Sequence, residues 1–198
     1  MTPSSKTLMI TSFYVNLENV EAVKSELSGE RLYASPDGEV VFLTAGASAG
    51  SLAAEATSPK AATRETRLAK HLKSDWRRQI VGHVEDVRTH LGGLEASRYL
   101  QIRYIEVPRS AHDAYLEWRE QTIFKHVRGQ DEIESFIAYH TQLSAKPGVV
   151  FLAGFSCAPE RYLASFSTPH YLDIVRQAGD KYIFGGQQGL STKVYERL

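Results

Sequence analysis

The chain has 198 residues, enough for one domain of about 200 residues or for two fused units of about 100 residues each. Hydrophobic residues make up 42% and charged residues 23%, which is ordinary for a globular protein and excludes collagen-like, coiled-coil and largely disordered chains. The 23 basic and 23 acidic residues cancel, so no net charge attracts the chain to nucleic acid or to an anionic membrane.

The cysteine content and the lack of long apolar runs narrow the class of protein further. The single cysteine, Cys157, excludes an internal disulfide framework and a cysteine-based zinc site, and we expect it to be structural. No apolar run approaches the roughly 20 residues that cross a bilayer. Residues 1–6 lead into a strand without the apolar core of a signal peptide. We therefore expect a cytoplasmic protein with no nucleic-acid or membrane partner.

The first half of the chain alternates strand-like and helix-like segments. β-branched and aromatic residues predict a strand at residues 8–15, and apolar residues at helical spacing predict a short helix at residues 20–27. A Pro-Asp-Gly turn joins residues 31–35 and 39–44 into a hairpin. Residues 46–58 are rich in Gly, Ala, Ser and Thr, and we expect a mobile connection there, with a weak Ala-rich turn as the alternative.

The longest predicted helix follows this connection, at residues 59–91. It begins after Ser58 and ends at the pair Gly92-Gly93. Apolar residues recur along it at steps of three or four, which predicts one buried stripe. The stripe consists of Leu68, Leu72, Trp76, Ile80, Val84, Val87 and Leu91.

The second half repeats the order strand, helix, hairpin, helix and strand. Pro108 closes the first strand, Ser110 caps the helix that follows, and a Pro-Gly turn joins the two hairpin strands. The predicted strands are residues 98–107, 135–143, 149–155 and 191–196, and the predicted helices are residues 110–128 and 169–179.

The two halves also match in sequence at one stretch. Val-Val-Phe-Leu at residues 40–43 is repeated at residues 149–152. Pro59 and Pro169 follow these stretches at similar distances, each preceded by Ser or Thr. The shared order of elements makes duplication the better interpretation, with one unit at residues 1–95 and the other at residues 96–198.

This order of elements is that of a ferredoxin-like unit, in which both helices cover one face of an antiparallel sheet. The other face is apolar and must be covered. We therefore predict an α+β fold in which two tandem ferredoxin-like units pack their antiparallel sheets face to face as an α+β barrel. Because one chain supplies both units, further homodimerisation is optional.

Residues 147–155 and 162–171 carry a resemblance to a known family. A Pro-Gly turn, an apolar strand and a helix pair ending in Ser-Thr-Pro-His-Tyr resemble the dimeric α+β barrel superfamily, particularly its antibiotic-biosynthesis-monooxygenase-like members. The first half shares only the hairpin and Ser58-Pro59, since Lys60 and Ala61 replace the His and the aromatic residue. The resemblance implies quinone-forming or ring-opening oxygenases, haem-degrading enzymes, polyketide cyclases or stress-response proteins, so fold alone does not name the reaction.

The predicted strand at residues 135–143 carries the first candidate catalytic residues. Side chains alternate along a strand, so Phe136, Ala138 and His140 share one face and Tyr139 lies on the other. A His or Tyr that points between sheet and helices suits a general base or a donor toward a phenolic substrate. We predict catalytic roles for His140 and Tyr139. The alternative is a half-exposed histidine or a satisfied polar group in the core.

The predicted helix at residues 110–128 carries a second group. Trp118 and His126 are eight residues apart, slightly more than two turns, so we expect them near one face together with Tyr115. An indole and an imidazole on one face suit a flat aromatic guest, with His126 as a catalytic group. The alternative is that Trp118 is core and His126 is a helix-end residue.

Other positions complete the predicted substrate site. Tyr104 and Arg103 lie on opposite faces of their strand, so at most one of them lines any one pocket, and we select Tyr104. His170 stands at a helix start, where a packing role is the alternative. The predicted substrate-binding residues are Trp118, Tyr115, Phe136, Phe151, His170 and Tyr104.

A haem-binding alternative rests on the predicted long helix. Trp76 and His83 are seven residues apart and would share a face of it. A haem iron needs one axial histidine, for which His83 is the candidate, and otherwise no metal site is expected.

These observations favour a small tailoring oxygenase of secondary metabolism that acts on an aromatic, polyketide-like phenol or hydroquinone. A phenolate can itself reduce O₂, so no cofactor is expected beyond O₂ as co-substrate, and reduced flavin or haem are the alternatives. The protein would supply an apolar pocket, a base and donors that hold the anion of the small aromatic molecule. The other hypotheses are haem binding or degradation, polyketide cyclisation and a stress-response barrel without enzymatic activity.

Overall fold

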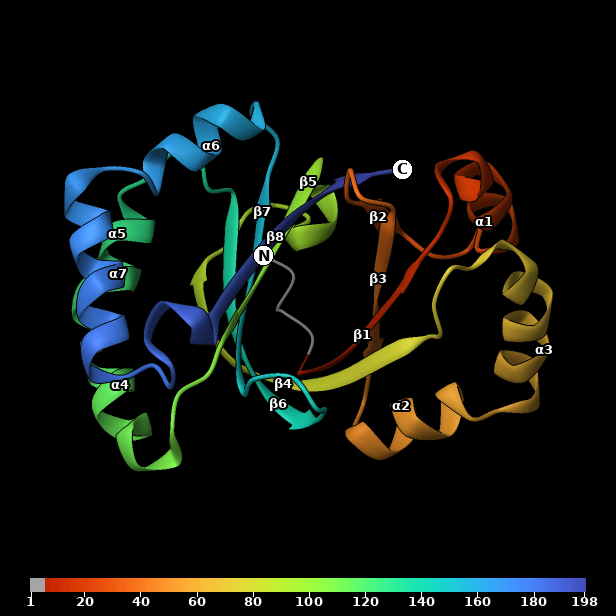
Figure 1. The fold of residues 1–198 in the computed structure, drawn as a ribbon, viewed down its shortest axis with the longest axis horizontal. Coiled ribbons are helices and arrows are strands. Elements are labelled where there is room, and N and C mark those ends of the chain that lie inside the picture. The colour runs from red at the N-terminus through yellow and green to blue at the C-terminus, as the bar shows by residue number, and fades with distance from the viewer. Residues whose placement is uncertain (1–5) are drawn as a thin grey trace. The chain divides into compact units, whose positions relative to one another are not determined.

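The computed structural model describes residues 6–198 and has an α+β fold (Figure 1). Its strands form a closed antiparallel barrel in the order β1-β3-β2-β8-β5-β7-β6-β4. The chain divides into two compact units, and the boundaries fall inside β4, β6 and β8. We call residues 6–83, 141–145 and 195–198 the N-unit, and residues 84–140 and 146–194 the C-unit. The predicted fold class is confirmed, and the division after residue 95 stays a prediction about the repeat.

The N-unit begins with strand β1 (Thr7–Tyr14), which pairs with strands on both sides. Phe13 lies opposite Val40 of β3, and Met9 lies opposite Ile80 of β4. The predicted Pro-Asp-Gly turn forms, with Gly38 at a φ of +85°, a conformation that glycine adopts without strain. The elements are β1, a 3₁₀ turn (Leu17–Asn19), α1 (Val20–Glu26), β2 (Leu32–Ala34), β3 (Glu39–Gly46), α2 (Ala49–Ala56), α3 (Pro59–Leu68), a 3₁₀ turn (Ala69–His71) and β4 (Arg77–Arg88).

The predicted helix over residues 59–91 is wrong beyond its first third. Helix α3 ends at Leu68, and residues 77–88 form β4. Apolar residues at steps of three or four occur by chance here: Val84 and Leu91 of the predicted stripe are exposed. The β-branched content of this segment favours a strand, and pairing with β1 satisfies its backbone.

Residues 46–58 are also more ordered than the sequence suggested. They contain helix α2, which begins with a capping box: Ser48 and Ser51 bond each other's backbone N–H. Alanine has the highest helix propensity, and the fully buried Leu52 attaches the helix to the core of the N-unit. The prediction of a mobile connection is wrong for this reason.

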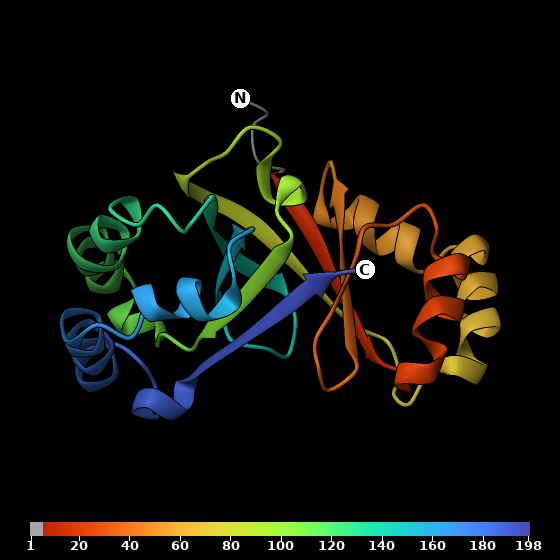
Figure 2. The ribbon, with the colours of Figure 1, turned by 90° about the horizontal axis from the view of Figure 1, so that it is seen from above.

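The C-unit contains three central strands and a helix layer. Strand β7 lies between β5 and β6, with Phe151 opposite both Arg103 and Ala138. Helices α4, α5 and α7 lie side by side in Figure 1, and Figure 2 shows them on one side of these strands. The elements are a 3₁₀ turn (Gly93–Ala96), β5 (Tyr99–Ile105), a 3₁₀ turn (Arg109–Ala111), α4 (His112–Arg119), a π-helical turn (Glu120–Phe124), α5 (Lys125–Arg128), β6 (Ser135–Leu143), β7 (Val149–Phe155), α6 (Pro159–Ser165), α7 (Pro169–Lys181), a 3₁₀ turn (Gly186–Gly189) and β8 (Leu190–Arg197).

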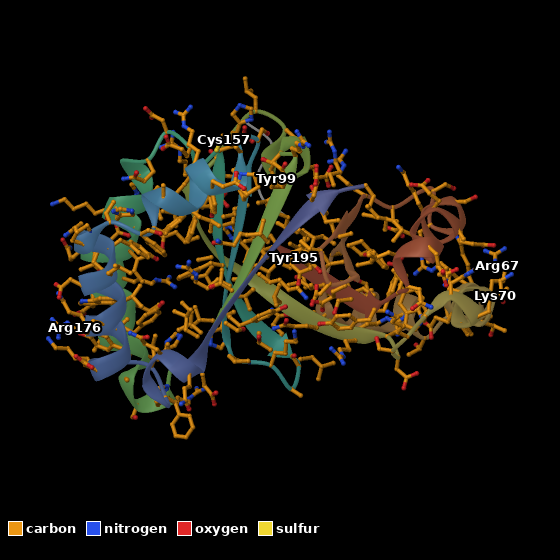
Figure 3. The ribbon with its side chains drawn as sticks, turned by 45° about the horizontal axis from the view of Figure 1, so that its top comes forward. Arg67, Lys70, Tyr99, Cys157, Arg176 and Tyr195 are labelled. Atoms are coloured by element: carbon orange, nitrogen blue, oxygen red, sulfur yellow. The ribbon has the colours of Figure 1, made fainter. Side chains whose placement is uncertain are left out.

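The outer faces of the helices carry the charge. Arg176 points away from the C-unit on α7, and Arg67 points outward on α3 of the N-unit, as does Lys70 just after α3 (Figure 3). Within residues 6–198, no helix has the length and apolar character to span a membrane.

Candidate functional site

The candidate site lies in the C-unit, between the strands and the helices. Alternation along β5 points Tyr99, Gln101, Arg103 and Ile105 to one side, and Tyr99 and Ile105 belong to the same buried cluster as residues of α4 to α7. We call the side chains between β5–β7–β6 and these helices the C-unit layer. Its buried aromatic residues are Tyr99, Tyr115, Phe124, Phe136, Phe151, Phe155, Tyr162, Phe166 and Tyr171.

Ring stacking organises one part of the C-unit layer. The rings of Phe155 and Tyr162 stack with centroids 3.7 Å apart and planes 4° from parallel. Tyr99 stacks on Phe155 at 5.0 Å, and Phe166 meets Tyr171 edge to face at 4.9 Å. This part of the C-unit layer is therefore built from aromatic rings packed face to face and edge to face.

Two polar residues of β5 enter this aromatic layer. Tyr162 donates its hydroxyl hydrogen to Gln101 Oε1 over 3.1 Å. Arg103 donates from Nη1 to the Tyr171 hydroxyl over 2.5 Å and from Nε to the Thr192 hydroxyl over 3.0 Å. Gln101 is 2% exposed and Arg103 is 8% exposed, so both polar groups have left bulk water.

Arg103 has no carboxylate partner among the described residues, although arginine stays charged at all ordinary pH values. The rings of Phe166 and Tyr171 lie 5.3 Å and 5.9 Å from its guanidinium carbon. Arg119, the other buried arginine of the C-unit, has Glu85 at 3.6 Å. The C-unit layer thus holds one guanidinium whose charge no acidic side chain balances.

Tyr115, on α4, contributes a hydroxyl to the same layer. Its side chain is fully buried, and its hydroxyl has no hydrogen-bond partner. Burial raises the pKa of Tyr115, against the opposing effects of the charges of Arg119 and Arg103, so the phenol remains protonated. A protonated hydroxyl without a partner is a free donor inside the protein.

His126, on α5, is the imidazole in contact with the aromatic layer. Its Nε2 lies 2.9 Å from the backbone oxygen of Ser165, and its ring centroid is 4.7 Å from that of Tyr171. Burial lowers the pKa of His126, so the ring is neutral at pH 7. A carbonyl only accepts, so Nε2 carries the hydrogen and Nδ1 carries the lone pair of a base.

A π-helical turn, Glu120–Phe124, lies between Trp118 and His126. Both residues contact α7 or its end: the ring of His126 lies 4.7 Å from that of Tyr171, and the ring of Trp118 lies 5.1 Å from that of Tyr182. Trp118 and Tyr182 also line an open groove of about 640 Å³ on the C-unit. The ring of the fully buried Tyr115 lies 6.0 Å from the rings of both Trp118 and Tyr182.

The structure brings only some of the other predicted residues together. Phe136 and Phe151 lie in the C-unit layer, and His170, exposed on α7, has its ring centroid 6.1 Å from that of His126. His140 is on the same face of β6 as the buried Phe136 and Ala138, as expected, but it is exposed, 5.2 Å from His112 ring to ring.

Two predicted tyrosines lie away from this layer. Tyr139 is buried on the opposite face of β6, where burial raises its pKa. Tyr104 lies on the far face of β5 beneath Lys146.

The chain was compared with known proteins by sequence and by structure. No sequence-family model and no curated protein sequence matches it. Its structure is similar to that of an anthrone oxidase-like protein, with a TM-score of 0.70 at 10% identity, over 100% of this chain and 94% of the other. It is also similar to a ferredoxin-fold protein of Listeria monocytogenes related to antibiotic biosynthesis monooxygenases. The TM-score is 0.57 at 8% identity, over 98% of this chain and 96% of the other. A haem-degrading enzyme of the same organism is similar with a TM-score of 0.57 at 8% identity, over 96% of this chain and 99% of the other.

The chain has the fold of the antibiotic-biosynthesis-monooxygenase-like proteins. The resemblance that the sequence predicted is thereby confirmed. At these identities the likeness establishes the monooxygenase-like fold, and the chemistry has to be argued from the side chains of this chain.

The haem alternative placed Trp76 and His83 on one face of a helix. The predicted pair of Trp76 and His83 shares no helix: His83 is half-buried on β4, while Trp76 precedes β4 and packs 4.7 Å from Phe13. We therefore derive no step through haem.

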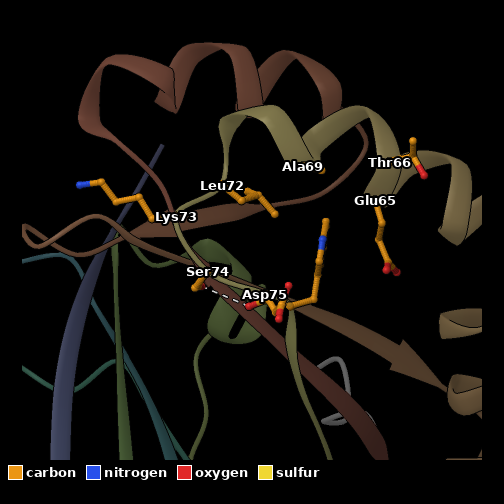
Figure 4. A pocket seen from close by; sticks show the side chains of 8 residues that line it. Glu65, Thr66, Ala69, Leu72, Lys73, Ser74 and Asp75 are labelled. Carbon is orange, nitrogen blue, oxygen red and sulfur yellow. Dashed lines mark hydrogen bonds between the residues drawn. The ribbon is translucent and has the colours of Figure 1, made fainter.

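A second groove lies in the N-unit and is polar (Figure 4). It measures about 600 Å³ and follows the segment after α3. Ser74 donates to the backbone oxygen of Asp75, so part of its polar lining is already satisfied within the loop. Its lining residues are Glu65, Thr66, Ala69, Leu72, Lys73, Ser74, Asp75 and Trp76.

The sequence analysis missed Arg103 and Gln101. The strand 98–107 showed their common face, but it did not show which face meets the helices, and Tyr104 was selected instead. A signal was present: Gln101 and Arg103 alternate with apolar Leu100 and Ile102 in a strand whose residues are all buried. Two large polar side chains on one face of such a strand indicate a polar site inside the protein.

Proposed function

We propose that this protein is a small tailoring oxygenase that oxidises an aromatic, polyketide-like phenol or hydroquinone with O₂ in secondary-metabolite biosynthesis. The observation that carries the proposal is the neutral imidazole of His126 against the aromatic rings of the C-unit layer. The likeness to an anthrone oxidase-like protein supports the choice of substrate class. The aromatic rings bind a planar substrate, and His126 acts as its general base.

In the reaction, Nδ1 of His126 accepts the acidic proton of the substrate, and the resulting anion is electron-rich enough to reduce O₂. For an anthrone, the methylene carbon loses two hydrogens and gains one oxygen as a carbonyl. The second oxygen atom leaves as water, so one O₂ is consumed for each quinone formed. The protein supplies the base, the aromatic surface and groups that stabilise the anion. This tailoring chemistry requires O₂ as co-substrate and no bound cofactor.

The test measures O₂ uptake and quinone formation with dithranol, an anthrone, in buffer containing EDTA and no flavin. The wild-type protein should consume O₂ above the buffer rate and form quinone in a one-to-one ratio with O₂. His126→Ala should lower kcat about a hundredfold or more, since a general base contributes roughly 10²–10⁴-fold. His90→Ala, which changes an exposed histidine outside the layer, is the matched control and should keep full activity. A wild-type rate equal to that of buffer, or an unchanged kcat in His126→Ala, would contradict the proposal.

A further inference from the structure

The C-unit layer contains more hydrogen-bond donors than acceptors. Arg103 Nη2 donates to no described residue, and Gln101 Nε2 and the Tyr115 hydroxyl are buried without partners. Gln101 and Arg103 lie two residues apart on one face of β5, and Tyr115 belongs to the same buried cluster as Tyr171, to which Arg103 is hydrogen-bonded. Each unfilled group can give a hydrogen, so the guest that satisfies them must supply acceptors.

The buried positive charge of Arg103 also calls for a guest that carries acceptor atoms. Burial of a cation is costly unless an anion or several hydrogen bonds compensate it. The partners of Arg103 are two hydroxyls and two aromatic rings, all neutral. The buried charge of Arg119, by contrast, is compensated by the carboxylate of Glu85 at 3.6 Å. The charge balance around Arg103 is therefore completed only when a negatively charged guest is present.

We propose that the C-unit layer binds its substrate as an aromatic oxyanion, with Arg103 as the residue that selects the charged form. The guest is a planar ring system bearing a phenolate, enolate or carboxylate oxygen. Arg103 Nη2 binds this oxygen, and Gln101 Nε2 and the Tyr115 hydroxyl supply further hydrogen bonds. The aromatic rings of the layer hold the planar part of the guest.

This inference rests on the proposed function for the identity of the site and adds the charge state of the substrate. A phenol gives its proton to His126 and becomes the anion that Arg103 stabilises, so base and cation act on the same guest. The electron-rich anion is also the form that reduces O₂. Arg103 thus favours the reactive form of the substrate over the neutral one.

The test is a binding titration with 2-naphthoate and with its neutral methyl ester, which share one ring system and differ in charge. Neither probe is oxidised, so the outcome is independent of turnover. The wild-type protein should bind the carboxylate at least about tenfold more tightly than the ester, since a hydrogen bond to a charged group is stronger than one between neutral groups. Arg103→Met should abolish this preference. Arg119→Met, which removes the buried arginine that has a carboxylate partner, is the matched control and should retain it.

A second variant tests the same inference without changing charge. Tyr115→Phe removes a hydroxyl that has no partner, so the variant should fold and melt at the same temperature as the wild type or higher. Its affinity for 2-naphthoate should nevertheless fall at least threefold, while its affinity for the ester stays unchanged. A structural role for this hydroxyl predicts the reverse, a lower melting temperature with unchanged affinity.

Two results would overturn the inference: no preference for the carboxylate in the wild type, or a preference that persists in Arg103→Met. These results can be separated from a failure of the proposed function. If the carboxylate preference holds but dithranol is not oxidised, the anion site stands and the oxygenase proposal falls. If dithranol is oxidised but the preference is absent, the oxygenase proposal stands and the anion site falls.

Discussion

The two units share the sequence Val-Val-Phe-Leu in one strand each, but different side chains pack around it. Val-Val-Phe-Leu occurs in β3 of the N-unit and in β7 of the C-unit, and Phe42 and Phe151 both belong to the buried core of their own unit. Around Phe42 the core is mainly aliphatic, with Val15, Leu32 and Leu68 fully or nearly fully buried. Around Phe151 it contains tyrosines, a glutamine and an arginine. Buried polar atoms without partners occur in both units, at Thr11 and Gln79 as well as at Gln101 and Tyr115. The units differ in the cation near the shared phenylalanine: Arg64 near Phe42 has Glu30 at 3.1 Å, whereas Arg103 has no carboxylate partner among the described residues and is the group that we propose a guest completes.

The largest expected effect on stability is shared by the two units. Phe42→Ala and Phe151→Ala each remove a fully buried ring and should each cost about 3–5 kcal/mol in the free energy of unfolding. Urea denaturation measures this. Only Phe151→Ala should also weaken binding of 2-naphthoate, because only Phe151 lies in the C-unit layer. Equal losses of binding in both folded variants would remove the functional distinction between the units.

The next effect is a pH dependence that belongs to the C-unit. Burial lowers the pKa of His126 below the ordinary histidine value of about 6.5. Because the base must be neutral, kcat/KM for dithranol should be highest at pH 8 and decline in acid with its midpoint below pH 6.5. A profile already half-lost at pH 6.5 would contradict His126 as the base.

The same shift has a consequence for stability. The unfolded chain binds a proton at His126 more readily than the folded protein does, so stability is complete above about pH 6.5 and decreases as the pH falls toward the lower folded-state pKa. The His126→Ala variant should lose this part of the dependence. Urea denaturation at a series of pH values between 5 and 8 measures it.

A smaller effect concerns unpaired hydroxyls. Thr11 in the N-unit has a buried hydroxyl without a partner, as Tyr115 has in the C-unit. Thr11→Val should raise the free energy of unfolding by about 1 kcal/mol, because the unsatisfied group is removed. It should leave naphthoate binding unchanged, whereas Tyr115→Phe should weaken it. Weaker naphthoate binding in Thr11→Val would show that the N-unit contributes to the site.

The smallest effect is expected at Cys157. Burial raises the pKa of this half-buried thiol, so little reactive thiolate is present at pH 7. Cys157→Ser should therefore keep the dithranol turnover and the melting temperature of the wild type. Loss of turnover in a variant that melts normally would make Cys157 part of the reaction.

The sequence predicts most of the strands and both hairpins, because alternation and Pro-Asp-Gly or Pro-Gly turns are local signals. It fails at β4, where Ile80, Val84 and Val87 fit a helical stripe as well as a strand, and only pairing with β1 decides. The fold was still predicted correctly. The second half shows the full order strand, helix, hairpin, helix and strand, and the first half was interpreted as a repeat of it although its closing strand was missed.

The candidate site was less predictable for physical reasons. A π-helical turn such as Glu120–Phe124, between Trp118 and His126, cannot be read from residue spacing. Alternation separates Arg103 from Tyr104 but does not say which face the helices cover. The unpaired charge of Arg103 depends on which side chains the fold brings to it, which no local pattern contains.

The most direct test of the central claim is a crystal structure of the protein with 2-naphthoate. We predict that the carboxylate lies within hydrogen-bond distance of Arg103 Nη2, about 2.7–2.9 Å for a charged pair, with the rings against the aromatic residues of the C-unit layer. A naphthoate bound in the polar groove of the N-unit, or bound only between Trp118 and Tyr182 without contact to Arg103, would contradict the claim.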